Sequence, residues 1–177
     1  LAPAQGSIQY EVRQFNSSIR NDTTEYQGTP TEALDRKWKD LYECTQISES
    51  EANNLVHKTV RIPGDEEYYI TSLEVFHQLH CLNLLRKSLY PEYYPLTPVD
   101  HLDHCVDTLR QALTCTVDIS PLSWKWDERL HITEPQLNGT HQCMNFTKIQ
   151  EWAHHHQLKS EFNNTVNLDL GLGHEGH

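Results

Sequence analysis

The chain has 177 residues and a formal net charge of −11, from 14 basic and 25 acidic side chains. This length suffices for one domain with a continuous core, and the acidic balance argues against a protein that follows nucleic-acid phosphates with a basic face. No run of about 18 apolar residues occurs, so no segment of this sequence is predicted to span a bilayer.

The first half of the chain is predicted to contain two helices and three short extended segments. Residues 9–15, 58–62 and 68–70 are predicted as strands or extended arms. Thr29 before Pro30, with Glu32 following, predicts a helix capped by Thr29. Ser48 with Glu51 has the pattern of a capping box and predicts a short helix to about residue 56.

The second half is predicted to be more helical. Thr71 with Glu74 opens one helix, Thr97 before Pro98 opens another, and a last helix is predicted over about residues 146–157. We therefore expect a mainly α protein, a single compact helical domain over residues 1–159 with short extended or β segments. Residues 160–177 form a polar tail, predicted as disordered or as an arm.

A five-residue motif, H-x-x-H-C, occurs twice. The first copy holds His77, His80 and Cys81, and the second holds His101, His104 and Cys105. Residues i and i+3 lie on one helix face, so four imidazoles from two helices are predicted to converge on a metal between them, at least partly buried. Ordinary core histidines are the alternative, which the exact repetition disfavours.

The chemistry of the candidate ligands narrows the choice of metal but does not select one. Neutral imidazoles suit copper, zinc, iron or nickel, and the lack of an H-E-x-x-H glutamate argues against a zinc protease. His141, two residues before Cys143, is a further ligand candidate, and His131 is a weaker one. The other histidines are expected to be solvated, namely His57, His154, His155 and His156.

Some neighbouring side chains have two open interpretations. Asp107 and Arg110 either orient the metal ligands by hydrogen bonding to them or form a surface ion pair. Four aromatic side chains either line a substrate pocket or pack in the core, namely Tyr68, Tyr69, Trp124 and Trp126.

Two observations place the chain in the secretory pathway. Five N-x-[ST] sequons predict glycosylation at Asn16, Asn21, Asn138, Asn145 and Asn163. Five cysteines are compatible with two disulfides and one thiol, Cys44. The cysteines could instead be thiolate ligands; if they are bridged, the pairs are Cys81–Cys105 with Cys115–Cys143, or Cys81–Cys115 with Cys105–Cys143.

Three blocks of sequence resemble the fungal ustiloxin-biosynthesis oxidase family, the UstYa-like proteins with two H-x-x-H-C motifs. The similarity covers about residues 8–157. Its N-terminal block is Tyr26-Gln27-Gly28-Thr29-Pro30 with Leu34, Asp35, Trp38, Leu41 and Tyr42. Its central block is His104-Cys105-Val106-Asp107 with Leu109, Arg110, Gln111, Ala112, Leu113 and Cys115, and its C-terminal block includes Trp124, Trp126, His141, Cys143 and Trp152.

The resemblance implies a type II membrane protein whose lumenal domain carries the site, so an N-terminal anchor is expected upstream of Leu1. It also implies fungal secondary metabolism, including ribosomally made cyclic peptides, and copper as the metal, as one or two ions rather than zinc. We therefore expect a copper-dependent oxidase that uses O2 on a C–H or phenolic position of a peptide or small metabolite.

Two alternatives remain at this point, a copper-dependent halogenase and a scaffold with structural zinc. A second family member or a second copy of the chain is the expected protein partner, and no nucleic acid is expected. The substrate, the reaction outcome, the number of metal ions and the oligomeric state do not follow from the sequence.

Overall fold

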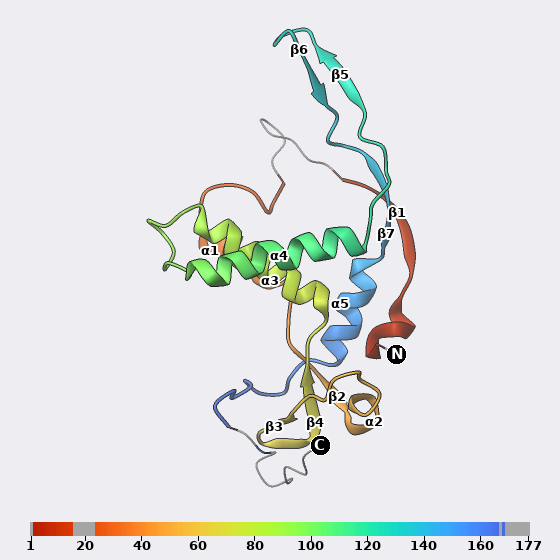
Figure 1. Cartoon of the computed structure of the whole chain (residues 1–177), viewed down its shortest axis with the longest axis vertical. Helices are drawn as coiled ribbons and strands as arrows, with labels where there is room; N and C mark the ends of the chain where they lie inside the picture. The colour runs from red at the N-terminus through yellow and green to blue at the C-terminus, as the bar shows by residue number, and fades with distance from the viewer. Residues whose placement is uncertain (1, 16–23, 167, 169–177) are drawn as a thin grey trace.

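A computed structural model describes residues 2–15, 24–166 and 168 of the chain (Figure 1). The secondary structure elements, in chain order, are η1 (Pro3–Ser7), β1 (Tyr10–Gln14), α1 (Glu32–Lys39), β2 (Thr45–Ser48), α2 (Glu49–Ala52), β3 (Arg61–Ile62), β4 (Asp65–Thr71), α3 (Glu74–Ser88), α4 (Val99–Cys115), β5 (Trp124–Asp127), β6 (Ile132–Pro135), β7 (Thr140–Met144) and α5 (Phe146–His155).

The described residues form a mixed α/β fold, with 37% helix, 20% strand and three small antiparallel sheets. The prediction of a mainly α fold is therefore wrong. The strands have two to seven residues each, too short for a strong alternation of polar and apolar residues, while helix caps left clear local signals. The predicted domain boundary at residue 159 stays a prediction.

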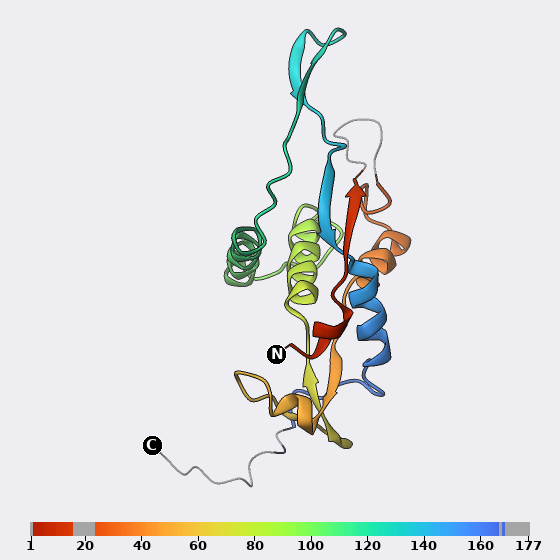
Figure 2. The same ribbon diagram turned by 90° about the vertical axis from the view of Figure 1, so that its right-hand side faces the viewer.

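The two-stranded sheet β1–β7 joins the beginning of the chain to its last third. Tyr10 pairs with Met144 and Gln14 with Thr140, which confirms the strand predicted over residues 9–15. Helix α5 follows β7 directly, and η1 lies beside it (Figures 1 and 2). The side chain of Asn145 caps α5 by accepting a hydrogen bond from the backbone N–H of Lys148 at 3.1 Å.

The three-stranded sheet has the order β2–β4–β3. Ile47 and Ile62 are buried in it. The predicted capping box of Ser48 and Glu51 is confirmed with both of its bonds, although α2 ends at Ala52, before the predicted end. Thr71 is the last residue of β4 and pairs with Thr45 of β2. It does not cap α3, which starts after Leu73 without a side-chain cap.

Two other predicted caps, Thr29 and Thr97, do not cap their helices. The side chain of Thr31, not Thr29, accepts the hydrogen bond from the backbone N–H of Leu34 that caps α1. Helix α4 starts after Pro98 without a side-chain cap, so Thr97 does not have the predicted role. A proline that fixes an extended approach to the helix is enough to start α4 here.

Helices α3 and α4 pack against each other (Figures 1 and 2), with Cys81 and Cys105 fully buried between them. Another face of α4 is open to solvent, where Val106 is 55% exposed and Leu113 is 74% exposed.

The hairpin β5–β6 extends away from the helices (Figures 1 and 2). Trp124 is 60% exposed and Trp126 is 51% exposed on its first strand, so the alternative in which they pack in the core is wrong. Among the described helices, none is both long and apolar enough to cross a membrane.

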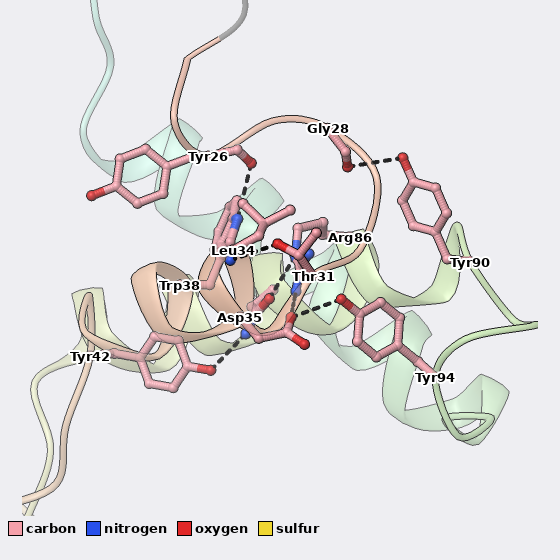
Figure 3. Close-up of polar contacts among 11 residues, drawn as sticks. Tyr26, Gly28, Thr31, Leu34, Asp35, Trp38, Tyr42, Arg86, Tyr90 and Tyr94 are labelled. Carbon is pink, nitrogen blue, oxygen red and sulfur yellow. Dashed lines mark hydrogen bonds and ion pairs between the residues drawn. The ribbon is translucent and has the colours of Figure 1, made fainter.

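Helix α1 is joined to α3 by a half-buried ion pair (Figure 3). Arg86, whose side chain is only 10% exposed, donates to Asp35 Oδ1 at 2.5 Å. The hydroxyl of Tyr94 donates to the same oxygen at 2.8 Å. Burial alone would raise the pKa of Asp35, but these two hydrogen bonds outweigh it and hold the pKa below its ordinary value of 3.8.

Asp35→Asn should therefore lower the free energy of unfolding by about 3 kcal/mol near neutral pH, because Arg86 loses the charge that compensates its burial. Since the pKa of Asp35 is lowered in the folded protein, its stabilisation is complete above its ordinary value and is lost as the pH falls through the folded value. Urea unfolding should show a constant difference between parent and variant down to about pH 5, and a difference that shrinks as the pH falls further through the folded pKa of Asp35.

The matched control is Asp40→Asn, an exposed position at the end of the same helix, which should change stability by no more than about 0.5 kcal/mol. Equal losses in the two variants would contradict the importance of the ion pair.

Candidate metal centre

The first histidine of one motif meets the last histidine of the other. His77 on α3 and His104 on α4 stack with ring centroids 5.3 Å apart and planes at 30°. Their Nε2 atoms are 3.4 Å apart. Two ligands at 2.0–2.1 Å from a tetrahedral ion are about 3.3 Å from each other, so this spacing suits two ligands of one ion.

Cys81 provides a third donor at the same place. Its Sγ lies 3.7 Å from His77 Nε2, and the ligand atoms of His77, Cys81 and His104 all lie within 4.8 Å of one another. The local helix geometry explains the cluster, because Cys81 stands one turn after His77 on α3. A set of two imidazoles and one thiol fits copper or zinc better than a hard cation.

The other two motif histidines form a wider pair beside this group. The ring centroids of His80 and His101 are 6.3 Å apart, and so are those of His101 and His104. Burial, followed by the neighbouring His101 and His77, lowers the pKa of His80 below its ordinary 6.5. His80 is therefore neutral at physiological pH, which is the form that binds metals.

The structure thus brings the four motif histidines together at the contact between the two helices, and their binding to a shared metal stays a prediction. Their burial differs from the prediction. His77 and His80 are half-buried, whereas His101 and His104 are exposed. The cluster lies at the solvent-facing rim of the contact between the helices.

His141 and His131 are not in this group. His141, on β7, places Nδ1 2.6 Å from Asp118 Oδ2, and hydrogen bonds from Ser120, followed by the one with His141, lower the pKa of Asp118 to about 2. His131 lies in the turn of the hairpin β5–β6 with a positive φ of 52°. The histidines outside the motifs that were expected to be solvated are exposed at His57, His154 and His155, while His156 stacks on Trp152.

Asp107 and Arg110 form an exposed ion pair at 2.7 Å. Hydrogen bonds from Arg110 and Gln111 lower the pKa of Asp107, and among the described residues neither side chain is hydrogen-bonded to a motif histidine. Tyr68 and Tyr69 lie on the sheet of β4, where each ring packs against a cation, Lys159 and Arg61.

Other residues contact the imidazoles instead. Thr108 Oγ1 lies 3.5 Å from His104 Nε2, and Glu74 Oε2 lies 3.6 Å from His77 Nδ1. Both stand one helical turn from the histidine that they approach, so i, i+3 and i, i+4 spacing was the signal that could have identified them.

All five cysteines are thiols in this structure. The buried Cys105 thiol contacts Cys81; burial, followed by this contact, raises the pKa of Cys105 to about 12, so Cys105 is not a thiolate at neutral pH. The disulfides stay a prediction, and the contact favours the pairing that includes Cys81–Cys105. Such a bridge would withdraw Cys81 from the metal and leave the imidazoles.

The predicted glycosylation sites differ in their surroundings. Asn138 and Asn163 are exposed, while Asn16 and Asn21 lie outside the described residues. Asn145 caps α5 and donates from Nδ2 to Glu11 at 3.0 Å, so a glycan on this nitrogen would replace that bond.

Protein made in an oxidising secretory host should yield a disulfide-linked pair of tryptic peptides containing Cys81 and Cys105, because the two side chains touch. Arg86 and Lys87 lie between the two cysteines, so trypsin separates them. Alkylation before digestion, followed by mass spectrometry, measures the link, and a sample reduced beforehand is the control. Alkylated Cys81 and Cys105 in the unreduced sample would disprove the bridge.

Comparison with known proteins agrees with the resemblance seen in the motifs. The model of the family described as mycotoxin biosynthesis protein UstYa matches residues 1–156. The UstYa family oxidase phomYc of Diaporthe leptostromiformis is 30% identical over 157 residues, which cover 77% of this chain and 61% of the relative. The UstYa family oxidase phomYd of the same fungus is 32% identical over 166 residues, which cover 85% of this chain and 51% of the relative.

A third relative has a different name, transacylase cctO of Talaromyces islandicus, and is 29% identical, with coverage of 89% of this chain and 60% of the relative. This chain thus spans between 51% and 61% of the length of these relatives. No solved structure matches it significantly. Because the family model covers most of the sequence, including both H-x-x-H-C motifs, this chain belongs to the UstYa family.

Proposed function

We propose that this chain carries the metal centre of a copper-dependent oxidase of fungal secondary-metabolite biosynthesis. The proposed substrate is a peptide or small metabolite, of the ribosomal cyclic peptide type, oxidised with O2 at a C–H or phenolic position. The observation that supports this most is the pair of Nε2 atoms 3.4 Å apart, contributed by His77 and His104 from two helices, in a chain whose relatives include proteins named as oxidases.

The residues present fit copper. Imidazole nitrogens are ligands that copper accepts in either common oxidation state, and the Nε2 atoms of His77 and His104 stand at a spacing suited to one ion. Cys81 would add a third donor only in protein in which it is not bridged to Cys105. When bound, copper supplies the electron transfer with dioxygen that amino-acid side chains cannot perform.

The protein's own contribution is to hold and expose the centre. His77 would bind through Nε2, since Glu74 lies on its Nδ1 side, and His104 would bind from the facing helix. The buried Cys81 and Cys105 close the inner side of the cluster. The exposed His101 and His104 leave the outer side open, so substrate would approach along α4.

The proposed location is the lumen of the secretory pathway, with attachment to a membrane only through an N-terminal anchor. The exposed sequons at Asn138 and Asn163 are accessible to glycosylation there, and an oxidising compartment would favour the bridge between Cys81 and Cys105.

His77→Ala and His104→Ala should each weaken copper binding by on the order of 100-fold or more. Loss of a residue that only hydrogen-bonds to a metal ligand already lowers metal affinity by about 10- to 100-fold. Elemental analysis after loading with copper(II), together with competition against a chelator, measures this. His155→Ala is the matched control, because that histidine is exposed at the end of α5, and it should bind copper like the parent.

Oxygen uptake by the copper-loaded parent with ascorbate as reductant tests the redox role. Stoichiometric zinc with no oxygen uptake would instead support the structural-zinc scaffold. Full copper stoichiometry and affinity in both His77→Ala and His104→Ala would refute the assigned ligands.

A further inference from the structure

Tyr42 contacts the histidine cluster from outside the two motif helices. It lies between α1 and β2, and its ring meets the imidazole of His80 edge to face, with centroids 5.6 Å apart and planes at 83°. This is a favourable geometry for two aromatic rings. The contact joins the N-terminal block of the chain to the first motif.

The hydroxyl of Tyr42 is fixed by a buried amide. Asn83, only 3% exposed, stands one turn after His80 on α3 and donates from Nδ2 to the Tyr42 hydroxyl at 2.9 Å. Its Oδ1 accepts from Arg86 Nε at 2.9 Å. Because a buried amide is costly without partners, both bonds hold Asn83 and therefore Tyr42 in place.

Figure 3 shows Tyr42 beside α1 with its hydroxyl directed toward the group of Arg86 and Asp35. The connection runs from Asp35 through Arg86 and Asn83 to Tyr42 and ends at the ring of His80. A continuous series of contacts therefore connects the interface of α1 and α3 with the proposed metal centre.

His80 differs from His77 and His104 in what orients its ring. Glu74 lies beside His77 and Thr108 beside His104. Among the described residues, none is hydrogen-bonded to either ring nitrogen of His80. The ring of His80 contacts the rings of Tyr42 and His101 instead.

We propose that Tyr42 is a positioning residue that fixes the imidazole of His80 for metal binding. The proposal rests on the proposed function insofar as it assigns His80 to a copper centre. The orientation of His80 itself does not depend on the metal and is measured separately.

The first measurement uses metal-free protein labelled at histidine and records the NMR resonance of the His80 ring carbon–hydrogen pair. Tyr42→Leu should shift this resonance, because the neighbouring aromatic ring is lost, and should leave that of His141 unchanged. Tyr42→Phe keeps the ring and should stay close to the parent. Tyr42→Met fills more of the space and replaces Tyr42→Leu if that variant does not fold.

The second measurement is copper(II) binding, by chelator competition and by the nitrogen hyperfine pattern in electron paramagnetic resonance. Tyr42→Leu should bind about 10-fold more weakly with an altered pattern, and Tyr42→Phe should restore most of the parent behaviour. Tyr90→Leu is the matched control. Tyr90 follows α3 and donates to the carbonyl of Gly28 in the N-terminal block, so it also joins these two parts of the chain, but no described contact joins its ring to an imidazole.

The outcomes separate the two proposals. A parent protein that does not bind copper refutes the proposed function, while the metal-free spectra still decide whether Tyr42 contacts the ring of His80 in solution. An unshifted His80 resonance in Tyr42→Leu, or an equal loss of copper affinity in Tyr90→Leu, overturns the role of Tyr42.

Discussion

The ion pair between Arg86 and Asp35 determines how helix α3 is presented to the rest of the molecule. The guanidinium is largely withdrawn from water and lies near the rings of Trp38 and Tyr94, at 5.5 and 5.3 Å from their centroids. A charge in such a place requires a partner, so α1 must dock where Asp35 reaches it. Together with the packing of α3 against α4, this favours one rotation of α3 about its axis, and with it the direction in which both histidines of the first motif point.

The spacing inside the motif then determines where the metal centre lies. Successive residues on a helix point about 100° apart. With the small, buried Cys81 and Cys105 facing each other at the centre of the helix contact, the histidine just before each cysteine is turned toward the rim. The cysteines therefore allow α3 and α4 to approach closely, while the imidazoles gather at the edge of the contact. The imidazoles are partly exposed because, in each motif, a histidine directly precedes the buried cysteine.

The sequence predicted what local spacing encodes. Two motifs on two helices, and the meeting of their histidines, follow from i, i+3 periodicity. The structure's remaining features depend on pairings between distant residues: Tyr10 with Met144, Arg86 with Asp35, and Tyr42 with His80. No local pattern marks such partners. The burial of the second motif was also mispredicted, since α4 has apolar residues on a face that the described part of the chain does not cover, such as Val106 and Leu113.

The position of the histidine cluster at the rim of the contact between α3 and α4 bears on which substrates the proposed metal centre could oxidise. Under the proposed function, the ion would be held on its inner side by α3 and would face outward beside the exposed His101 and His104. A side chain of a long or cyclic peptide can reach such a place without the whole substrate entering the protein, whereas a small metabolite would need further walls to be oriented. Under the proposed function, the open rim would favour a bulky substrate. Selectivity would then depend on surfaces beside the cluster, and the exposed face of α4 is the nearest of these.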